Sequence, residues 1–242
     1  MSNEIRVGRA ASSGLLTAIV AVALASCQAG SSGPIRTPAV TMTAEPTASP
    51  IPRLNGQDPL SPGRYQVNAS IPAIVTVEVP SGWVAGGDWV VAGPATDPDN
   101  GITIRFYTIP NIAVDPLSPA AGNLDPPVGP TVDDLVQAIV AHPAWTASEP
   151  TDITIDGRDG QLVTIMIPLD APLPADSEGE FYFYADPAGG GIWGWLPGQT
   201  FDWYIVDVDG QRLIIDAFHY PDASPEDLAA QRAVVESVQF GS

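Results

Sequence analysis

Two stretches of the chain, 152–168 and 202–220, place an Asp-Gly pair between runs rich in β-branched residues. Their sequences are DITIDGRDGQLVTIMIP and DWYIVDVDGQRLIIDAFHY. Asp-Gly in this setting is the strongest short-range signal for a two-residue hairpin, because both turn positions need a positive φ. Each stretch is therefore predicted to form two antiparallel strands, and hairpin-linked strands predict a mainly antiparallel sheet.

Two other segments carry the start signals of helices. The first, 131–142, begins at Thr131, which can cap free backbone N–H groups, and ends where His142 precedes a proline. The second begins at Ser224, with Pro225 at the first helical position. The predicted apolar sides are Leu135, Val136, Ile139 and Val140 in the first helix, and Leu228, Val234, Val235 and Val238, interrupted by Gln231, in the second.

Shorter strands are predicted around these elements. The segments that favour them are RYQVNA (64–69), AIVTVEVP (73–80), GDWVVAG (87–93) and GITIRFYTIP (101–110), with SVQF (237–240) as a final short strand. Together with the hairpins, they predict a twisted, mostly antiparallel sheet of about seven or eight strands. With two helices packed on that sheet, the fold class is α+β.

The N-terminus has the pattern of an export signal. Arg6 and Arg9 are followed by 17 uncharged residues, fewer than the roughly 20 needed to span a bilayer as a helix. Leu24-Ala25-Ser26-Cys27, at the end of this run, resembles the bacterial lipobox. That resemblance implies cleavage of a signal peptide, 1–26, and lipidation of Cys27, the single cysteine of the chain. The alternatives are an uncleaved anchor, or an exported protein in which Cys27 is incidental.

Residues 27–63 are predicted to be a linker that begins with the lipidated cysteine. The segment is rich in Pro, Ser, Thr, Gly and Ala and has no apolar period, a composition typical of a disordered spacer. An arm that docks on the domain is the alternative. The remainder, 64–242, is long enough for one core and is predicted to form a single α+β domain.

The charge of the chain excludes one class of partner. Its formal net charge is −19, it contains no lysine, and removal of the signal peptide makes it one unit more negative. Such a surface repels phosphate backbones and anionic lipid headgroups, so we expect no nucleic-acid partner. An acyl anchor at Cys27 would therefore have to hold the protein on the bilayer, on the extracytoplasmic face of the cell membrane.

The order of elements resembles a known group of domains. The stretches PGRYQV, VTVEVPSGW, DITIDGRDGQ, IVDVDGQRLIIDAF and SPEDLAAQRAVVESVQF, within 62–240, are similar to actinobacterial secreted or lipoprotein domains of unknown function. The VPSGW turn and the VESVQF ending also resemble the Mog1/PsbP-like fold. The resemblance implies a fold that serves binding and scaffolding, and it implies no particular activity.

The sequence shows no clear catalytic or metal-binding pattern. His142 and His219 are the only histidines, and a zinc site needs three or four Cys, His or carboxylate ligands. The acidic stretches 97–101 and 207–210 lack the spacing of a calcium loop, and turn formation explains both. We therefore expect no enzyme activity, no metal and no cofactor.

One aromatic stretch, 181–204, stands out from the rest of the chain. Trp193, Trp195 and Tyr184 are its candidate ligand-binding residues, because rings beside a glycine-rich loop can stack on sugars or apolar ligands. The alternative is that the rings belong to the core. The predicted function is a non-enzymatic binding or interaction module with an envelope protein as partner. A small-ligand carrier for a sugar or lipid is the alternative function.

Overall fold

The structure is a computed structural model of the chain, and Ala48–Ser242 form one compact unit in it. The residues that it describes are 50–56, 59–67, 69–87, 90–93, 101–172, 180–195 and 197–241. Cys27 and the stretch 97–100 lie outside this set, so the expected lipidation stays a prediction. None of the described helices is long and apolar enough to span a membrane.

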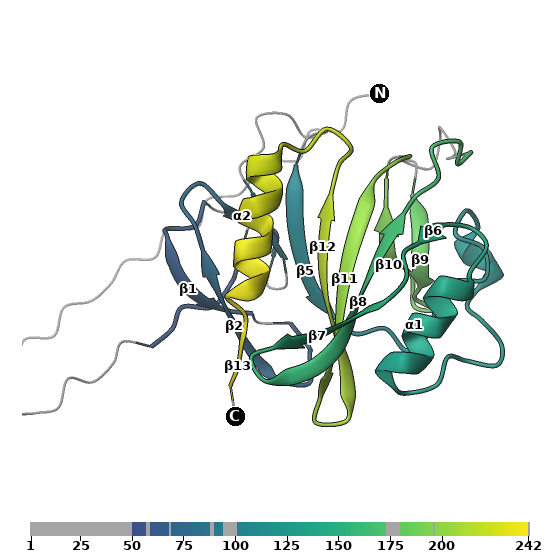
Figure 1. The fold of residues 1–242 in the computed structure, drawn as a ribbon, viewed down its shortest axis with the longest axis horizontal. Coiled ribbons are helices and arrows are strands. Elements are labelled where there is room, and N and C mark those ends of the chain that lie inside the picture. Colours follow the sequence, from purple (N-terminus) through teal and green to yellow (C-terminus); the bar gives the residue numbers. More distant parts are fainter. Residues whose placement is uncertain are drawn as a thin grey trace, which may run out of the picture. The chain divides into compact units, whose positions relative to one another are not determined.

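An eight-stranded sheet runs through the centre of the domain (Figure 1). Its strands in spatial order are β3 (Val84–Ala85), β4 (Val90–Ala92), β5 (Ile102–Tyr107), β12 (Gln211–His219), β11 (Thr200–Val208), β8 (Arg158–Met166) and β6 (Thr146–Ala147), with β7 (Thr151–Ile155) also paired to β8. All of these pairs are antiparallel. The two predicted hairpins are β7–β8 and β11–β12. Their turns place Asp156 and Asp209 at φ of 44° and 54°, as the Asp-Gly pairs predict.

Two smaller sheets and two helices accompany the central sheet in the described part of the chain. One sheet contains β1 (Gly63–Gln66), β2 (Ile74–Val79) and β13 (Gln239–Gly241), and the other contains β9 (Phe181–Ala185) and β10 (Gly191–Gly194). The helices are α1 (Val132–Ala141) and α2 (Pro225–Glu236), and a 3-10 turn, η2, spans Pro119–Ala121. The predicted α+β class, with a mostly antiparallel sheet and two helices, is confirmed. β10, however, lies where a loop was expected.

The central sheet has a hydrophobic core on each face. α2 and the β1–β2–β13 sheet pack on one face, and α1 and the β9–β10 sheet pack on the other (Figure 1). Along β12, Ile215 and Ala217 belong to the first core, whereas Ile214 and Phe218 belong to the second. This alternation follows from the two-residue period of a strand and explains why β11 and β12 are apolar on both faces.

The predicted helix starts are correct, but two side chains differ from expectation. Val140 is 41% exposed, so the buried stripe of α1 is narrower than predicted. Gln231 was expected to interrupt the apolar side of α2 and is instead buried. Its side-chain amide donates to the carbonyls of Thr103 (2.9 Å) and Phe218 (2.7 Å). These two bonds satisfy the amide and attach α2 to the sheet.

The domain begins earlier than residue 64, so the predicted linker boundary is wrong. Leu54 is completely buried in the core beside α2, and its N–H donates to the Gln66 carbonyl at 2.8 Å. The Gln66 N–H donates to the Pro52 carbonyl, and the Leu60 N–H donates to the Trp83 carbonyl, both at 2.8 Å. A proline-rich segment can dock in this way because only a few isolated backbone hydrogen bonds are needed. A regular strand would require a continuous ladder of N–H donors, which proline cannot supply.

We expect Leu54→Ala to lower the free energy of unfolding by about 2–5 kcal/mol, because the substitution leaves a cavity in the core. Urea denaturation of the variant and the parent chain measures this loss. Ile51→Ala is the matched control, since Ile51 is in the same segment but is 45% exposed. A loss at Leu54 no larger than that at Ile51 would contradict the docking of this segment.

Candidate functional site

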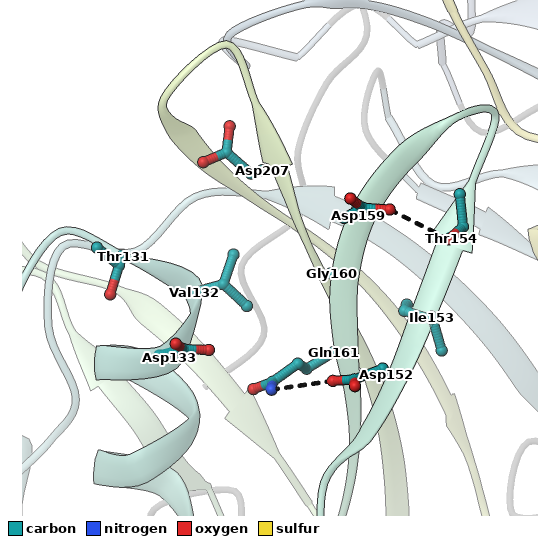
Figure 2. Close-up of a pocket in the computed structure, with 10 residues that line it drawn as sticks. All are labelled: Thr131, Val132, Asp133, Asp152, Ile153, Thr154, Asp159, Gly160, Gln161 and Asp207. Atoms are coloured by element: carbon teal, nitrogen blue, oxygen red, sulfur yellow. Dashed lines mark hydrogen bonds between the residues drawn. The ribbon is translucent and has the colours of Figure 1, made fainter.

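An open groove of about 620 Å³ lies between the start of α1 and the edge of the central sheet (Figure 2). Its walls come from the first turn of α1, from β7, from the first residues of β8 and from the end of β11. Four aspartates line it: Asp133, Asp152, Asp159 and Asp207. All four are exposed to solvent. A volume of this size is within the range of pockets that bind small molecules or peptide side chains.

The groove forms because α1 covers only part of the sheet face. A ten-residue helix is about 15 Å long, whereas a nine-residue strand extends about 30 Å. Polar side chains occupy the uncovered part. Gln161 donates to Asp152 on the paired strand at 3.3 Å, and Thr154 donates to Asp159 at 3.2 Å. These bonds hold the wall formed by β7 and β8 in one arrangement.

A close contact between strands forms the floor of the groove. Gly160 pairs with Val206 of β11, and a side chain on Gly160 would collide with the Ile205 carbonyl oxygen. Glycine is therefore required at this position for β8 and β11 to approach each other. The sheet is rigid here because backbone groups on both sides of Gly160 are paired.

The opposite wall is held by the N-terminus of α1. Thr131 accepts a hydrogen bond from the Asp134 N–H (3.1 Å), and the Asp134 carboxylate accepts one from the Thr131 N–H (2.9 Å). The hydrogen bonds from Thr131 hold the pKa of Asp134 below its usual value. Arg212 of β12 donates to the carbonyls of Gly129 (2.5 Å) and Thr131 (3.1 Å). The start of α1 is thus attached to the sheet beside the groove.

The groove is acidic and its charge is not neutralised from within. No arginine is among the residues that line it in the described part of the chain. Asp207 accepts from the Gly210 N–H at 2.7 Å, which is the turn role that the sequence suggested for it. Among the described residues, no group of three or more Asp, Glu, His or Cys side chains is placed to hold a metal ion. The four exposed carboxylates therefore give the groove a negative electrostatic potential.

The predicted aromatic candidates lie on the β9–β10 sheet and just after it. Tyr184, Trp193 and Trp195 are all half-buried. The Trp193 ring is 5.8 Å from Tyr182 and 6.4 Å from Trp195, measured between centroids. Tyr184 and Trp195 pack against the second core, and Trp195 is 5.8 Å from Phe218. The structure therefore places Trp193 beside Trp195. Of the two rings, Trp195 is the one that packs against the second core.

We expect Trp195→Ala to cost roughly 2 kcal/mol of unfolding free energy, about half the value for a fully buried tryptophan. Trp193→Ala should cost less, about 1 kcal/mol, because this ring packs mainly on other half-exposed rings. Chemical denaturation of both variants measures the difference. Equal losses above about 3 kcal/mol would make both rings core and remove them as candidates for binding.

A buried ion pair lies beneath β10. Arg105 of β5 and Asp216 of β12 are directly paired residues, and their side chains are 5% and 0% exposed. Arg105 donates to Asp216 Oδ2 through Nε (2.8 Å) and Nη2 (2.5 Å). Its Nη1 donates to the Trp193 carbonyl at 3.0 Å, and the Tyr107 hydroxyl donates to Asp216 at 2.9 Å. The pair therefore connects the central sheet to the β9–β10 sheet.

Burial determines the protonation behaviour of this cluster. Burial raises the pKa of Asp216, while the charge and hydrogen bonds of Arg105 act against that rise. Burial and the nearby Asp216 charge raise the pKa of Tyr107 well above its usual value, so its hydroxyl remains a donor. The guanidinium also lies 4.6 Å from the Phe218 ring centroid, within cation–π range. These contacts make the cluster a structural connection that is closed to solvent.

The chain shows a weak similarity to a solved protein structure. No protein-family model matches the chain, and a search of the curated proteins finds no match. Among solved structures, the chain is similar to cyanobacterial PsbP (CyanoP) from Synechocystis sp. PCC 6803, with 12% sequence identity and a TM-score of 0.35. The alignment covers 75% of this chain and 94% of that chain. The α+β class assigned here rests on the strands and helices of the chain itself.

The groove and the buried pair were both missed from the sequence. Arg105 is the one charged residue of β5, and Asp216 lies within the apolar run Leu213–Phe218 of β12, a pattern that signals burial with a partner. The groove had a weaker signal: Asp152 and Thr154 alternate on β7, as do Asp159 and Gln161 on β8. Alternating polar residues mark a solvated sheet face, but they do not reveal that α1 lies beside it.

Proposed function

We propose that the chain is a lipoprotein, tethered through Cys27 to the extracytoplasmic face of the cell membrane, and that its domain is a non-enzymatic binding module. The groove receives a lysine- or arginine-bearing segment of an envelope protein. The single observation that carries this proposal is the groove itself, with four exposed aspartates in a concavity whose walls are fixed by hydrogen bonds.

Charge complementarity supports a cationic partner. Each exposed ion pair is worth about 0.2–1 kcal/mol, so three or four acting together can change the affinity about tenfold or more. The wall formed by α1 also offers the apolar side chain of Val132, which can contact the methylene stems of lysine and arginine. Binding of this kind weakens as salt is added, because the Debye length falls.

The experiment is a titration with a short lysine- and arginine-rich peptide, followed by NMR amide shifts of the labelled protein. We expect shifts at Thr131–Asp133, Asp152–Thr154 and Asp159–Gln161. Neutralising Asp133, Asp152 and Asp159 together to asparagine should weaken binding about tenfold. The asparagine oxygens can still accept the bonds from Gln161 and Thr154, so the groove should keep its shape.

The control variant removes the same charge from the other face of the domain. Asp222→Asn, Glu226→Gln and Glu236→Gln lie on or just before α2, and all three are exposed. Glu226 is in the first turn of α2, as Asp133 is in the first turn of α1, so each variant loses one helix-dipole interaction. Equal weakening by the two variants would show attraction to net charge alone and would refute the groove as the binding surface.

The anchor is tested separately. Two or more acyl chains are needed for stable attachment, since each buried CH₂ contributes about 0.8 kcal/mol and one chain holds only marginally. Cys27→Ser should therefore transfer the protein from the detergent phase to the aqueous phase in a phase-partitioning assay. Unchanged partitioning would refute the lipoprotein assignment and leave the groove proposal untouched.

A small-ligand carrier remains the second candidate function. The observation that favours it is the set of half-buried rings of Tyr182, Tyr184, Trp193 and Trp195 around the β9–β10 sheet. Thermal unfolding with a panel of sugars and lipids tests it, because a ligand at 100 times its Kd adds about 2.7 kcal/mol. A reproducible shift that is lost in Trp193→Ala would favour the carrier.

A further inference from the structure

His142 occupies a buried position at the C-terminal end of α1. Only 8% of the residue is exposed, and its ring is stacked on Trp145 with centroids 3.9 Å apart and planes inclined by 12°. Nε2 is 3.0 Å from the Ala113 carbonyl oxygen, and Nδ1 is 3.3 Å from the Ala144 backbone nitrogen. The ring therefore joins two segments that flank α1 in sequence.

The two ring contacts select one protonation state. A carbonyl only accepts, so Nε2 must carry a hydrogen, and a backbone N–H only donates, so Nδ1 must have a free lone pair. A proton on Nδ1 would face the Ala144 N–H and break that bond. The neutral ring satisfies both partners, whereas the imidazolium satisfies only one.

The charged surroundings of the ring are sparse. Among the described residues, Asp115 in the 111–118 segment is the charged group that acts on the ring, and the last turn of α1 carries no basic residue. Trp145 covers a ring face, and the carbonyls of Ala113 and Val114 face the ring. Burial lowers the pKa of His142, and the two carbonyls and Asp115 only partly oppose this.

The segments that His142 joins form the walls of a small cavity. Ala144, Asp115–Leu117 and Phe181 line this space of about 250 Å³, together with Pro168, Asp170, Ala171 and Pro172. The 111–118 segment also covers the edge of β9. The Ala113 N–H donates to the Phe183 carbonyl, and the Tyr182 N–H donates to the Pro116 carbonyl, both at 2.8 Å. The ring therefore contacts both of the segments that contribute these lining residues.

We propose that His142 is a pH-sensitive latch that holds the 111–118 segment and Ala144 together. Uptake of a proton from solvent at Nδ1 breaks the bond to the Ala144 N–H and frees Ala144 from the ring, while Nε2 keeps its bond to the Ala113 carbonyl. The stabilisation by the latch is complete above the unfolded-state histidine pKa of about 6.5, where the ring is neutral in both states, and it is lost as the pH falls below that value. The Ala144 side of the cavity is thus released in acid.

The test is backbone hydrogen exchange of the full chain between about pH 7.5 and pH 5, corrected for intrinsic exchange, with NMR titration of the His142 ring. Protection of the Ala144 amide should fall about tenfold or more as the pH falls below about 6.5, whereas the Ala113 and Val114 amides should keep their protection. Protection of β11 and β12 should not change. This comparison in the parent protein does not depend on any variant folding.

Two variants sharpen the result. His142→Gln keeps a donor toward Ala113 but cannot titrate, so its local protection should not depend on pH. His219→Gln removes the other histidine, whose Nδ1 is 3.1 Å from the Tyr220 carbonyl, and should keep the parent behaviour. The latch is refuted if the ring titrates while the Ala144 amide stays protected, or if the same loss occurs in His142→Gln.

Discussion

Asp216→Ala is expected to destabilise the domain by about 3–5 kcal/mol, because it leaves the Arg105 guanidinium buried without its counter-ion. The carboxylate accepts three hydrogen bonds, two from Arg105 and one from Tyr107. Its removal also leaves the Tyr107 hydroxyl without this acceptor. Denaturant unfolding at neutral pH measures the effect, and the loss of fixed structure should include the β9–β10 sheet, since Arg105 also donates to the Trp193 carbonyl.

A double variant separates the penalty of burying an unpaired charge from the net contribution of the ion pair to stability. Arg105→Met combined with Asp216→Leu replaces both charges with apolar groups, and such replacements are often neutral or stabilising by 1–4 kcal/mol. We expect the double variant to recover most of the stability lost in Asp216→Ala. A double variant as unstable as the single one would show that the ion pair itself stabilises the fold.

Trp203→Ala is expected to cost about 3–5 kcal/mol, the usual loss for a fully buried aromatic residue. Trp203 is completely buried at the centre of β11, paired with Val163 on one side and Asp216 on the other. Its ring packs at 5.4 Å from Phe183 and 6.2 Å from Tyr107. The substitution therefore opens a cavity between the central sheet and the β9–β10 sheet.

Trp203→Phe is the matched variant, because it keeps an aromatic ring and removes the indole N–H. That N–H and Asp216 Oδ1 are both buried without a hydrogen bond of standard geometry, and the indole helps to lower the pKa of Asp216. We expect the phenylalanine variant to lose less than half as much stability as the alanine variant. If both variants lose the same stability in a thermal unfolding experiment, the stabilisation comes from the indole N–H and not from packing of the ring. That result would contradict this prediction.

The fold class could be predicted from the sequence because its strongest signals are local. The Asp-Gly turns need only two residues to define a hairpin, and Thr131 and Ser224 start helices through bonds within one turn. The docking of Leu54 could not be predicted in this way. Its partner Gln66 belongs to β1, and nothing in a proline-rich segment without apolar period indicates that contact.

The candidate site could be predicted only in part, for the same reason. Sequence analysis singled out Trp193 and Trp195, which the structure places next to each other, but the acidic groove collects residues from α1, β7, β8 and β11. The position of α1 over the sheet depends on Arg212, which bonds to carbonyls more than eighty residues away. Long-range contacts of this kind carry no local pattern.

The most direct test of the proposed function is site-specific photo-crosslinking in the cells that make the protein. A photoreactive residue at Thr154 lies in the groove wall, and one at Ala229 lies on an exposed position of α2 on the other face of the sheet. We expect a discrete adduct from position 154 that disappears when Asp133, Asp152 and Asp159 are changed to asparagine, and none from position 229. The same adduct from both positions, or one that persists without the three carboxylates, would contradict the assignment of the groove as the binding surface.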